Sequence, residues 1–562
     1  MIRTTVIVLQ SFMLLLGVHI AHADSKPGTL RSEPAALDAD LGKNQRATSR
    51  PTTSTAGSLP IIDYHQGKPF SPWVRGQTTH RSISPPGWEA VWDLNVGSLA
   101  RGVAVGLFAD MYDWRNIDSA TIRGLPTWNG RFTTLDFLQY ARDHKAAPLI
   151  TANVFGGGYY DQTDPKNKGT FICQTVNPGG LAADWVRYTN FILQKYRQGD
   201  ESRLAGEDLR VYNSIDKWDG KPKLLARTEG AVPPVRYWEI GNEPGIGGFS
   251  NIFSHHNLSP TEYRDRYKLI STAMKAVDPS LKFGPCLQNP IDATRGIDWL
   301  IPLAADRDAQ IDFVSYHPYY ADIQAAWGHD DAMTAALRDC KAALNSKSAR
   351  VRGVMNSHGR SNYDLIASEW DPMHWYAPWP MQGSMANAIA VVETCFTFAE
   401  DGVLGGNFLE QPQNYCGVNG AFTGLVGDMG NVLVSTSQQM GYAYDKSNFR
   451  IYVSKNAGDD SKLMIWGLNF DNAKPVTVNL GLTPCRIVSA TLKRYGTPGG
   501  CTTLTANCGM AWNHSDVTAG FNAANFPFTM QAAEISVLVL QLTPTAKTQP
   551  ERQTGPNASQ AG

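Results

Sequence analysis

The sequence of 562 residues is too long for one ordinary domain and long enough to bury a large core. Its 50 Lys and Arg are balanced by 51 Asp and Glu, so nothing in the composition suggests a nucleic-acid-binding surface, which would need a clustered positive excess. Charged residues make up 18% of the chain, whereas Trp and Tyr number 15 and 21. This composition favours a neutral, flat-faced ligand.

The first 23 residues have the pattern of a secretory signal peptide. Arg3 precedes a mostly apolar run, and Ala21-His22-Ala23 fits a cleavage site. Polar residues interrupt the apolar run, so it is a poor membrane span. We therefore expect a secreted or periplasmic protein with no membrane contact after signal cleavage. Residues 24–59 and 545–562 lack hydrophobic periodicity and are predicted to be a disordered leader and tail.

Between about residues 70 and 425, short apolar segments alternate with helical patterns, which is typical of a parallel α/β fold. Eight such segments are candidate strands: Pro72–Arg75, Gly102–Phe108, Ala147–Val154, Arg236–Ile240, Leu281–Gly284, Ile311–Tyr316, Asp364–Ser368 and Gly405–Leu409. Their number and span predict a (β/α)8 TIM barrel in a catalytic domain over residues 60–428.

Two helices between these strands have clear signals. Ser259-Pro260-Thr261-Glu262 is a capping box with proline at the first helical position. The following apolar residues, spaced by three and four, predict a helix that ends at Asp278-Pro279. A second helix is predicted near Gly180–Gln194.

After residue 429 the helical periodicity ends. Short apolar strands separated by Gly, Asn, Asp and Pro turns predict a C-terminal antiparallel β-sandwich over residues 429–544. Eight cysteines permit disulfides in an exported protein. Cys501 and Cys508 are close enough in sequence to bridge a loop, but the pairing stays open. No zinc-type cysteine spacing occurs, so we expect neither a metal nor another cofactor.

Two glutamates stand at the ends of the fourth and seventh predicted strands. Glu243 follows Asn242 just beyond the fourth strand, and Glu369 ends the seventh. Because strands four and seven lie on opposite sides of the barrel, these carboxylates would face each other across its mouth. One protonated and one ionised carboxyl group can cleave a glycosidic bond. A separation of about 5–5.5 Å gives retention of configuration and roughly 6.5–9.5 Å gives inversion; the sequence leaves this distance open.

The motifs around these glutamates resemble those of clan A glycoside hydrolases. Trp238-Glu239-Ile240-Gly241-Asn242-Glu243-Pro244 looks like the acid/base motif, Ala367-Ser368-Glu369-Trp370 like the nucleophile strand, and Phe313-Val314-Ser315-Tyr316-His317-Pro318-Tyr319 like the sixth strand. Three further segments are similar to α-L-arabinofuranosidases: Tyr112–Asn116, Asn153–Gly158 and Ala182–Asn190. Glu262–Pro285 is equally similar to β-xylosidases and some endoglucanases of the clan.

The resemblance implies a role for each matching residue. Glu243 would be the general acid and then the general base, and Glu369 the nucleophile of a retaining mechanism. Asn242 would bind the 2-hydroxyl of the sugar. One or more of the sixth-strand residues Tyr316, His317 and Tyr319 would orient a carboxylate.

Several further residues are candidates for sugar contacts. Asn153 is implied by the resemblance. Asp110 and Trp114 follow the second strand and could contact a terminal sugar. Trp370, Trp375 and Trp379 crowd the loop after the seventh strand, where aromatic rings could form a sugar platform or pack in the core.

Two departures from the arabinofuranosidase pattern leave the sugar open. Ser368 stands where that family usually has Asp, and Val103 to Phe108 lacks the arginine expected near the second strand. Glu410, after the eighth strand, is the chief rival to Glu369 as nucleophile.

The sequence therefore predicts a retaining glycoside hydrolase whose partner is an oligo- or polysaccharide, with arabinofuranosidase-like exo-action preferred. An endo-acting β-glucanase or xylanase is the alternative enzyme. A carbohydrate-binding protein without catalysis is the alternative of another class.

Overall fold

The computed structural model describes residues 59–78, 94, 96–102, 114–115, 133–155, 158–161, 170–173, 177–215, 225, 230–245, 258–290, 296–320, 322–373, 377–409, 416–436, 439–440, 447–499 and 502–543. All of them lie in one compact unit, Leu59–Gly562. The predicted signal peptide, nearly all of the leader and the tail lie outside these residues. Within the described part of the chain, no helix is both long and apolar enough to cross a membrane.

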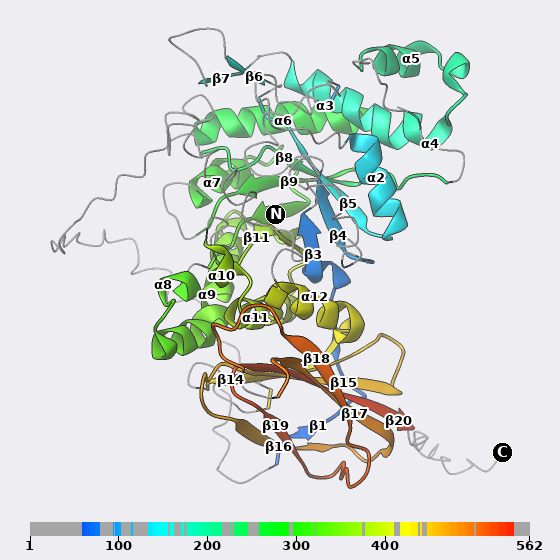
Figure 1. Ribbon diagram of the computed structural model, residues 1–562. Coiled ribbons are helices and arrows are strands. Elements are labelled where there is room, and N and C mark those ends of the chain that lie inside the picture. The colour runs from blue at the N-terminus through cyan, green and yellow to red at the C-terminus, as the bar shows by residue number, and fades with distance from the viewer. Residues whose placement is uncertain are drawn as a thin grey trace, which may run out of the picture. The chain divides into compact units, whose positions relative to one another are not determined.

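Eight parallel strands close into a barrel in chain order, which confirms the predicted TIM barrel (Figure 1). The strands are β3 (Gly76–Thr78), β4 (Leu99–Gly102), β5 (Ala147–Ala152), β8 (Tyr237–Ile240), β9 (Lys282–Leu287), β10 (Phe313–Tyr316), β11 (Asp364–Trp370) and β12 (Gly405–Phe408). The larger helices that follow them are α2 (Thr134–Asp143), α3 (Pro178–Arg187), α6 (Pro260–Val277), α7 (Ile297–Ala305), α9 (Asp330–Ser357), α11 (Met385–Asp401) and α12 (Cys416–Asp428).

The described short elements complete the barrel region. They are η1 (Pro72–Arg75), the hairpin of β6 (Gly158–Asp161) and β7 (Thr170–Cys173), the π-helix η6 (Tyr188–Ile192), α4 (Leu193–Lys195), η7 (Glu201–Arg203), α5 (Gly206–Asn213), α8 (Asp322–Ala325) and α10 (Trp379–Gln382).

The first predicted strand is wrong, because residues 72–75 form the 3-10 helix η1. Ser71 caps this turn through the N–H of Trp73, and proline occupies its first position. The barrel strand β3 starts directly afterwards at Gly76, where a Cβ would meet the carbonyl oxygens of Leu99 and Gly406. Glycine therefore permits the close approach of β3 to its neighbouring strands.

The second strand also begins earlier than predicted. Strand β4 spans Leu99–Gly102, whereas the sequence analysis placed it at Gly102–Phe108. Residues 103–108 lie outside the described residues. The shift brings Arg101 into the barrel, which changes the composition of the site described below.

Both predicted helices are confirmed. Helix α6 begins at the capping box, with reciprocal bonds between Ser259 and Glu262, and ends before Asp278. The helix predicted near Gly180–Gln194 is α3, which continues through the π-helix η6 into α4.

The C-terminal region contains two sheets, as predicted for a sandwich. One sheet has the strand order β18-β17-β20-β15-β14-β13-β2 and the other β1-β16-β19. Their bounds are β13 (Val432–Ser435), β14 (Phe449–Lys455), β15 (Lys462–Asn469), β16 (Val476–Leu482), β17 (Arg486–Gly496), β18 (Ala511–Asp516), β19 (Phe526–Met530) and β20 (Glu534–Thr543). Two strands from the segment before the barrel, β1 (Ile61–Ile62) and β2 (Lys68–Pro69), join them by pairing with β16 and β13. The sequence analysis did not anticipate this contribution.

The strands β14, β15 and β20 of the larger sheet are buried on both of their faces. On β14, Ile451 and Val453 pack in the core between the two sheets, whereas Tyr452 packs in the barrel's core cluster. Its ring stacks on Phe396 of α11 with centroids 4.5 Å apart. The alternation of strand residues thus fixes the sandwich against the barrel helices.

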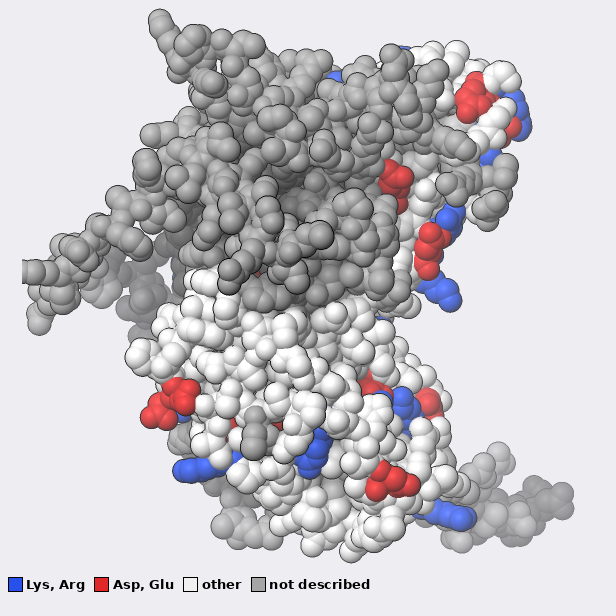
Figure 2. Space-filling view, in the orientation of Figure 1, with Lys and Arg blue, Asp and Glu red and all other residues white. Residues whose placement is uncertain are grey.

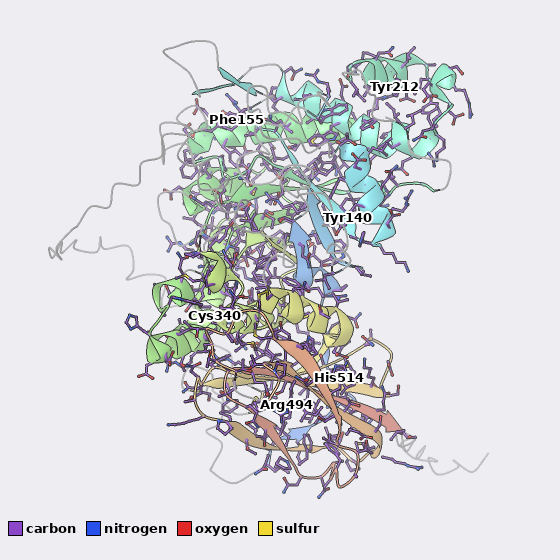
Figure 3. The ribbon with its side chains drawn as sticks, viewed as in Figure 1. Tyr140, Phe155, Tyr212, Cys340, Arg494 and His514 are labelled. Atoms are coloured by element: carbon purple, nitrogen blue, oxygen red, sulfur yellow. A yellow bond between two sulfur atoms is a disulfide. The ribbon has the colours of Figure 1, made fainter. Side chains whose placement is uncertain are left out.

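Polar contacts reinforce the same junction. Arg450 of β14 donates to Glu393 of α11 at 3.0 Å, and both side chains are buried. Cys416, at the start of α12, forms a disulfide with Cys508, so the bridge considered between Cys501 and Cys508 is wrong. Cys340 on α9 is buried in the adjoining core (Figure 3).

The described surface of the sandwich supports the charge argument made from composition. Figure 2 shows separate acidic and basic side chains there, rather than a patch of one sign. Arg494, for example, is paired with Glu534.

Candidate active site

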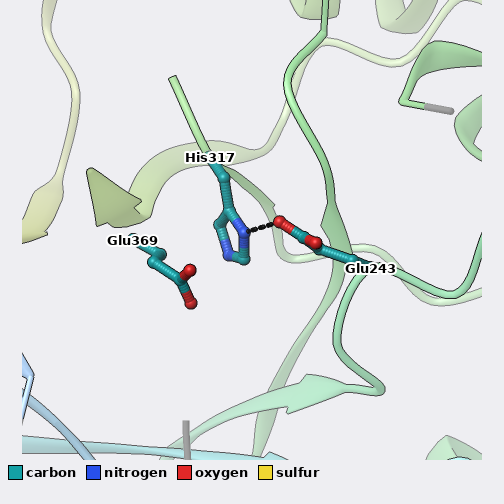
Figure 4. Close-up of side chains that lie close together, drawn as sticks. All are labelled: Glu243, His317 and Glu369. Carbon is teal, nitrogen blue, oxygen red and sulfur yellow. Dashed lines mark hydrogen bonds and ion pairs between the residues drawn. The ribbon is translucent and has the colours of Figure 1, made fainter. Parts of the chain in front are cut away.

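The two predicted catalytic carboxylates lie close together. One carboxylate oxygen of Glu243, one of Glu369 and one ring nitrogen of His317 all lie within 4.8 Å of one another. In Figure 4 the imidazole of His317 lies between the two carboxylates. Each glutamate is 6% exposed. The two side chains are thus at the spacing of a pair that acts on one bond.

A turn with left-handed backbone places Glu243. Gly241 has φ 74° and Glu243 has φ 46°, so the chain reverses directly after strand β8. This conformation costs a non-glycine residue about 1–2 kcal/mol, and such strain is found at functional sites. The backbone N–H of Glu243 donates to the carbonyl of Cys286 at 3.2 Å, and the hydroxyl of Tyr263 donates to the carbonyl of Ile240 at 2.6 Å. These bonds anchor the turn to strand β9 and helix α6.

The segment that resembles the third helix of arabinofuranosidases supports the same strand. Asn190, in the π-helix η6, donates to the carbonyl of Val235 and accepts from its N–H, at 2.9 and 2.8 Å. It also donates to Asp278 at the end of α6. The segment therefore holds the start of the strand that leads to Glu243.

Arg101 and Tyr319 hold Glu369 in its ionised form. Arg101 Nη1 donates to Oε2 of Glu369 at 3.0 Å, and the hydroxyl of Tyr319 donates to Oε1 at 2.6 Å. Burial alone would raise the pKa of Glu369, but His317, Arg101 and Tyr319 together lower it. A buried, ionised carboxylate with two donors is suited to act as a nucleophile.

Arg101 was missed by the sequence analysis, which looked for an arginine between residues 103 and 108. It is fully buried, donates from Nε to Glu239 at 2.7 Å and donates from Nη2 to Asn242 at 2.8 Å. The expected arginine is therefore present two residues before that window.

Glu239 is the second carboxylate that balances the charge of Arg101. It accepts from Thr151 at 2.6 Å and from Ser315, and it is fully buried. Burial alone would raise its pKa, but Arg101 and the surrounding hydroxyl groups lower the pKa to about 2. Arg101 thus favours the ionised form of Glu239. The sequence analysis quoted Glu239 only as part of the acid/base motif and predicted no role for it.

His317 contacts the other glutamate. Its Nδ1 lies 2.5 Å from Oε1 of Glu243, and its Nε2 lies 3.2 Å from the sulfur of Cys286. Burial would lower the pKa of His317, but Cys286 and the carboxylates of Glu369 and Glu243 raise it well above the usual value.

A buried lysine forms a hydrogen bond with the backbone of Tyr319. Lys347 of α9 donates to the backbone carbonyl of Tyr319. Burial lowers the pKa of Lys347 to about 8, whereas burial and the charge of Glu369 raise the pKa of the Tyr319 phenol. The phenol thus stays protonated as a donor to Glu369.

Of the three sixth-strand candidates, His317 and Tyr319 each contact a carboxylate of the site, whereas Tyr316 faces away from it. Ser315 and His317 point into the barrel, and the intervening Tyr316 points the other way because strand residues alternate. Tyr316 is fully buried on the side facing Asp401 and Arg352, whose charges act on its hydroxyl.

Two predicted sugar contacts are core residues instead. Trp114 is 2% exposed, stacks with Trp185 and Tyr188, and donates to the carbonyl of Leu181. Trp370 packs edge-on against two phenylalanines, Phe398 and Phe408. Neither ring presents a face to a ligand, so these two predictions are corrected.

The remaining candidates differ in position. Asn153 lies just past β5, and its side-chain carbonyl accepts from the N–H of Phe155 at 2.7 Å, which shapes the turn at the barrel mouth. Asn242 is buried beside Arg101. Asp110, Trp375 and Glu410 lie outside the described residues.

Glu243, His317 and Glu369 could by distance also surround a metal ion. The guanidinium of Arg101 already donates to Glu369, and both ring nitrogens of His317 face other groups, Glu243 and Cys286. This donor set fits proton transfer better than cation binding. The expectation of no metal and no other cofactor stays a prediction.

Comparisons with known proteins agree with this geometry. Residues 231–402 match the model of glycosyl hydrolases family 39, a segment that contains both Glu243 and Glu369. A search of curated protein sequences returned no match.

Solved structures share the fold across most of the chain. The α-L-arabinofuranosidase from Thermotoga maritima has a TM-score of 0.61 at 17% identity, covering 86% of this chain and 100% of that structure. AbfB, a family 51 α-L-arabinofuranosidase from Bifidobacterium longum, has a TM-score of 0.58 at 15% identity, with 84% and 98% covered. Cel44A, a family 44 endoglucanase from Clostridium thermocellum, has a TM-score of 0.55 at 15% identity, with 86% and 99% covered. The family match and the fold confirm the predicted resemblance to clan A glycoside hydrolases.

Proposed function

We propose that this clan A glycoside hydrolase retains the configuration of the anomeric carbon through double displacement. The observation that carries the proposal is the approach of the carboxylate oxygens of Glu243 and Glu369 within 4.8 Å. Retaining enzymes hold their carboxyl groups about 5–5.5 Å apart, whereas inverting enzymes leave space for a water molecule.

The unequal surroundings of the two carboxylates assign their roles. Glu369, bonded by Arg101 and Tyr319, attacks the anomeric carbon and forms a glycosyl–enzyme ester. Glu243 gives its proton to the leaving oxygen. Among the described residues, its ionisable hydrogen-bond partner is His317. Glu243 then takes a proton from the water that cleaves the ester, which releases the sugar and restores both residues.

For the substrate, we propose a terminal α-L-arabinofuranosyl residue removed by exo-action. Two of the structurally similar proteins named above are α-L-arabinofuranosidases, and the segments Asn153–Gly158 and Ala182–Asn190 resemble that family. The burial of Trp370 removes one of the aromatic residues that could have formed a long sugar platform.

An endo-acting β-glucanase is the second candidate. The observation in its favour is the similarity of Cel44A, an endoglucanase, over the same 86% of the chain.

We also propose that the protein is exported. The predicted signal peptide supports this proposal, and so does the disulfide between Cys416 and Cys508, because such bonds persist in oxidising compartments.

The test is hydrolysis of aryl α-L-arabinofuranosides, aryl β-D-xylosides, arabinoxylan and β-glucan, with the anomer of the first product followed by NMR. We expect release of free arabinose as the retained anomer. Release of the inverted anomer would contradict the double displacement. Mid-chain cleavage of β-glucan or xylan would favour the endo-acting candidates. A folded protein that binds sugar but releases no product from any substrate would support the non-catalytic alternative.

A further inference from the structure

Helix α9 has a lysine at a position where its periodicity predicts an apolar residue. Cys340, Leu344, Lys347 and Val351 follow one another at spacings of four, three and four, and all four side chains are buried. Lys347 is only 3% exposed. Because lysine is almost never fully buried unless it is paired, its presence in this stripe needs an explanation.

The bond that Lys347 makes is to the backbone of the site. Among the described residues, no carboxylate lies within ion-pair distance of its amine, which donates to the carbonyl of Tyr319. Burial lowers the pKa of Lys347 to about 8, and the more distant Cys340 and Asp322 only partly oppose this. An ammonium group and a neutral amine both carry N–H donors, so the bond does not depend on the charge of the lysine.

The carbonyl that Lys347 binds belongs to a tight turn directly after β10. The N–H of Tyr319 donates to the carbonyl of His317 at 3.0 Å, which closes the turn around Pro318. The backbone of Tyr319 is therefore fixed at both its N–H and its carbonyl. From this anchored backbone the hydroxyl of Tyr319 reaches Oε1 of Glu369 at 2.6 Å.

The following residue is anchored to the same helix. The hydroxyl of Tyr320 donates to the carbonyl of Ala336 on α9 at 2.7 Å, and its N–H donates to the carbonyl of Asp371 at 3.3 Å. The amine of Lys347 lies over the Tyr320 ring, 6.0 Å from its centroid. Helix α9 thus holds two consecutive tyrosines at the mouth of the barrel.

We propose that Lys347 is a positioning residue: by binding the carbonyl of Tyr319 it holds the phenol where it donates to Glu369, and so it favours the ionised nucleophile without touching it. Burial raises the pKa of Glu369, and the nearby charges of His317 and Arg101 oppose this directly, whereas Lys347 acts through the tyrosine. The inference rests on the proposed function only in calling Glu369 the nucleophile.

The first experiment titrates Glu369 in the full chain without a substrate. Carbon NMR of protein labelled at its glutamate carboxyl groups, with the signal of Glu369 identified by its loss in Glu369→Gln, gives this pKa. Tyr319→Phe removes the donor and should raise the pKa by about 1 unit. Lys347→Met, which is unbranched and nearly as long but has no donor, should produce part of that rise.

A second variant keeps a donor at the same position. The amide of Lys347→Gln is one bond shorter than the lysine chain, so the pKa of Glu369 should lie between those of the wild type and Lys347→Met. This variant also provides the test if Lys347→Met does not fold. An unchanged titration of Glu369 in the folded Lys347 variants would overturn the proposal.

A double-mutant cycle separates action through the phenol from a direct effect of the lysine's charge. If Lys347 acts through Tyr319, the change Lys347→Met should not raise the pKa of Glu369 any further in the Tyr319→Phe background. An equal rise in both backgrounds would mean that the charge of the lysine acts directly, and the positioning role would be wrong.

A matched control lies on the same helix. Lys341 is also buried, but it is paired with Glu400 and lies 5.3 Å from the ring centroid of Tyr452 in the sandwich. Lys341→Met should leave the titration of Glu369 as in the wild type. If it raised the pKa of Glu369 as much as Lys347→Met, the effect would be one of helix packing rather than of the bond to Tyr319.

Activity then distinguishes this inference from the proposed function. On a substrate that the enzyme hydrolyses, the acidic limb of kcat/KM should move upward in Lys347→Met together with the pKa measured by NMR. If the NMR titration moves as expected but the wild type hydrolyses no glycoside, the role of Lys347 is supported and the proposed function is contradicted. If the NMR titration does not move, the role of Lys347 is contradicted whatever the activity.

Discussion

Arg101 joins the second barrel strand to the seventh, because its Nη1 donates to Oε2 of Glu369 at 3.0 Å across the barrel interior. We expect Arg101→Met to raise the pKa of the nucleophile by about 1–3 units, as the loss of an adjacent cation does. The acidic limb of kcat/KM should move upward by the same amount. Arg101→Lys keeps the charge but not the fork of donors, so its shift should be smaller. An unmoved acidic limb in a folded Arg101→Met variant would show that the contact does not tune Glu369.

Removal of the nucleophile has a distinct signature. Glu369→Ala should lower kcat by about 10⁴-fold or more, because no side chain remains to form the glycosyl–enzyme. Added azide can enter the space left by the carboxylate and attack the sugar directly, so the rescued glycosyl azide should have inverted configuration. NMR of the product checks this, and a rescued product of retained configuration would contradict the assignment.

Removal of the acid should depend on the leaving group. Glu243→Ala should lower kcat by about 10²–10⁴-fold on substrates whose leaving groups need protonation. Aryl glycosides with acidic phenols should lose far less. Steady-state rates over a series of phenols measure this dependence; equal losses throughout the series would count against Glu243 as the acid.

The ion pair of Glu239 with Arg101 predicts a pH-dependent stability. The pKa of Glu239 is lowered to about 2 from its ordinary 4.5, so its stabilisation is complete above pH 4.5 and is lost as the pH falls through about 2. Near neutral pH we expect Glu239→Gln to lower the free energy of unfolding by about 3 kcal/mol. Chemical denaturation at several pH values should show the difference from wild type narrowing below pH 4.5. A difference independent of pH would mean that packing, not charge, accounts for the loss.

The disulfide predicts a stability difference away from the site. Cys416 and Cys508 are 92 residues apart in the chain, and a crosslink over so long a loop restricts the unfolded state. Cys508→Ser should lower the free energy of unfolding by about 2–4 kcal/mol. Cys485→Ser, at a half-buried free thiol, is the matched control and should change it less. Equal destabilisation of both variants would show that the crosslink adds nothing.

Local patterns in the sequence were sufficient for the barrel, the sandwich and the two glutamates. Strand periodicity and turn residues report on neighbouring positions in the chain, and a carboxylate directly after an apolar strand must lie at the barrel mouth. The same local rules recognised the capping box of α6, whose bonds join residues only three apart.

Local patterns failed where a strand is short or where two patterns compete. The four-residue strand β4 precedes a longer apolar run, so the prediction moved past Arg101. Pro72 and Ser71 favoured a 3-10 turn over a strand at the start of the barrel.

Only the tertiary structure decided which side chains meet. Arg101 and Glu369 are 268 residues apart in the chain, and closure of the barrel alone brings them together. Whether a side chain faces the site or the surrounding core depends on the alternation of successive strand residues. This alternation places His317 inside the barrel and Tyr316 outside it. The contact of Cys286 with His317 likewise joins neighbouring strands, and no pattern within either strand reveals it. The sequence by itself determined where the carboxylates stand along the chain, whereas their charge states follow from contacts that exist only after the strands have closed.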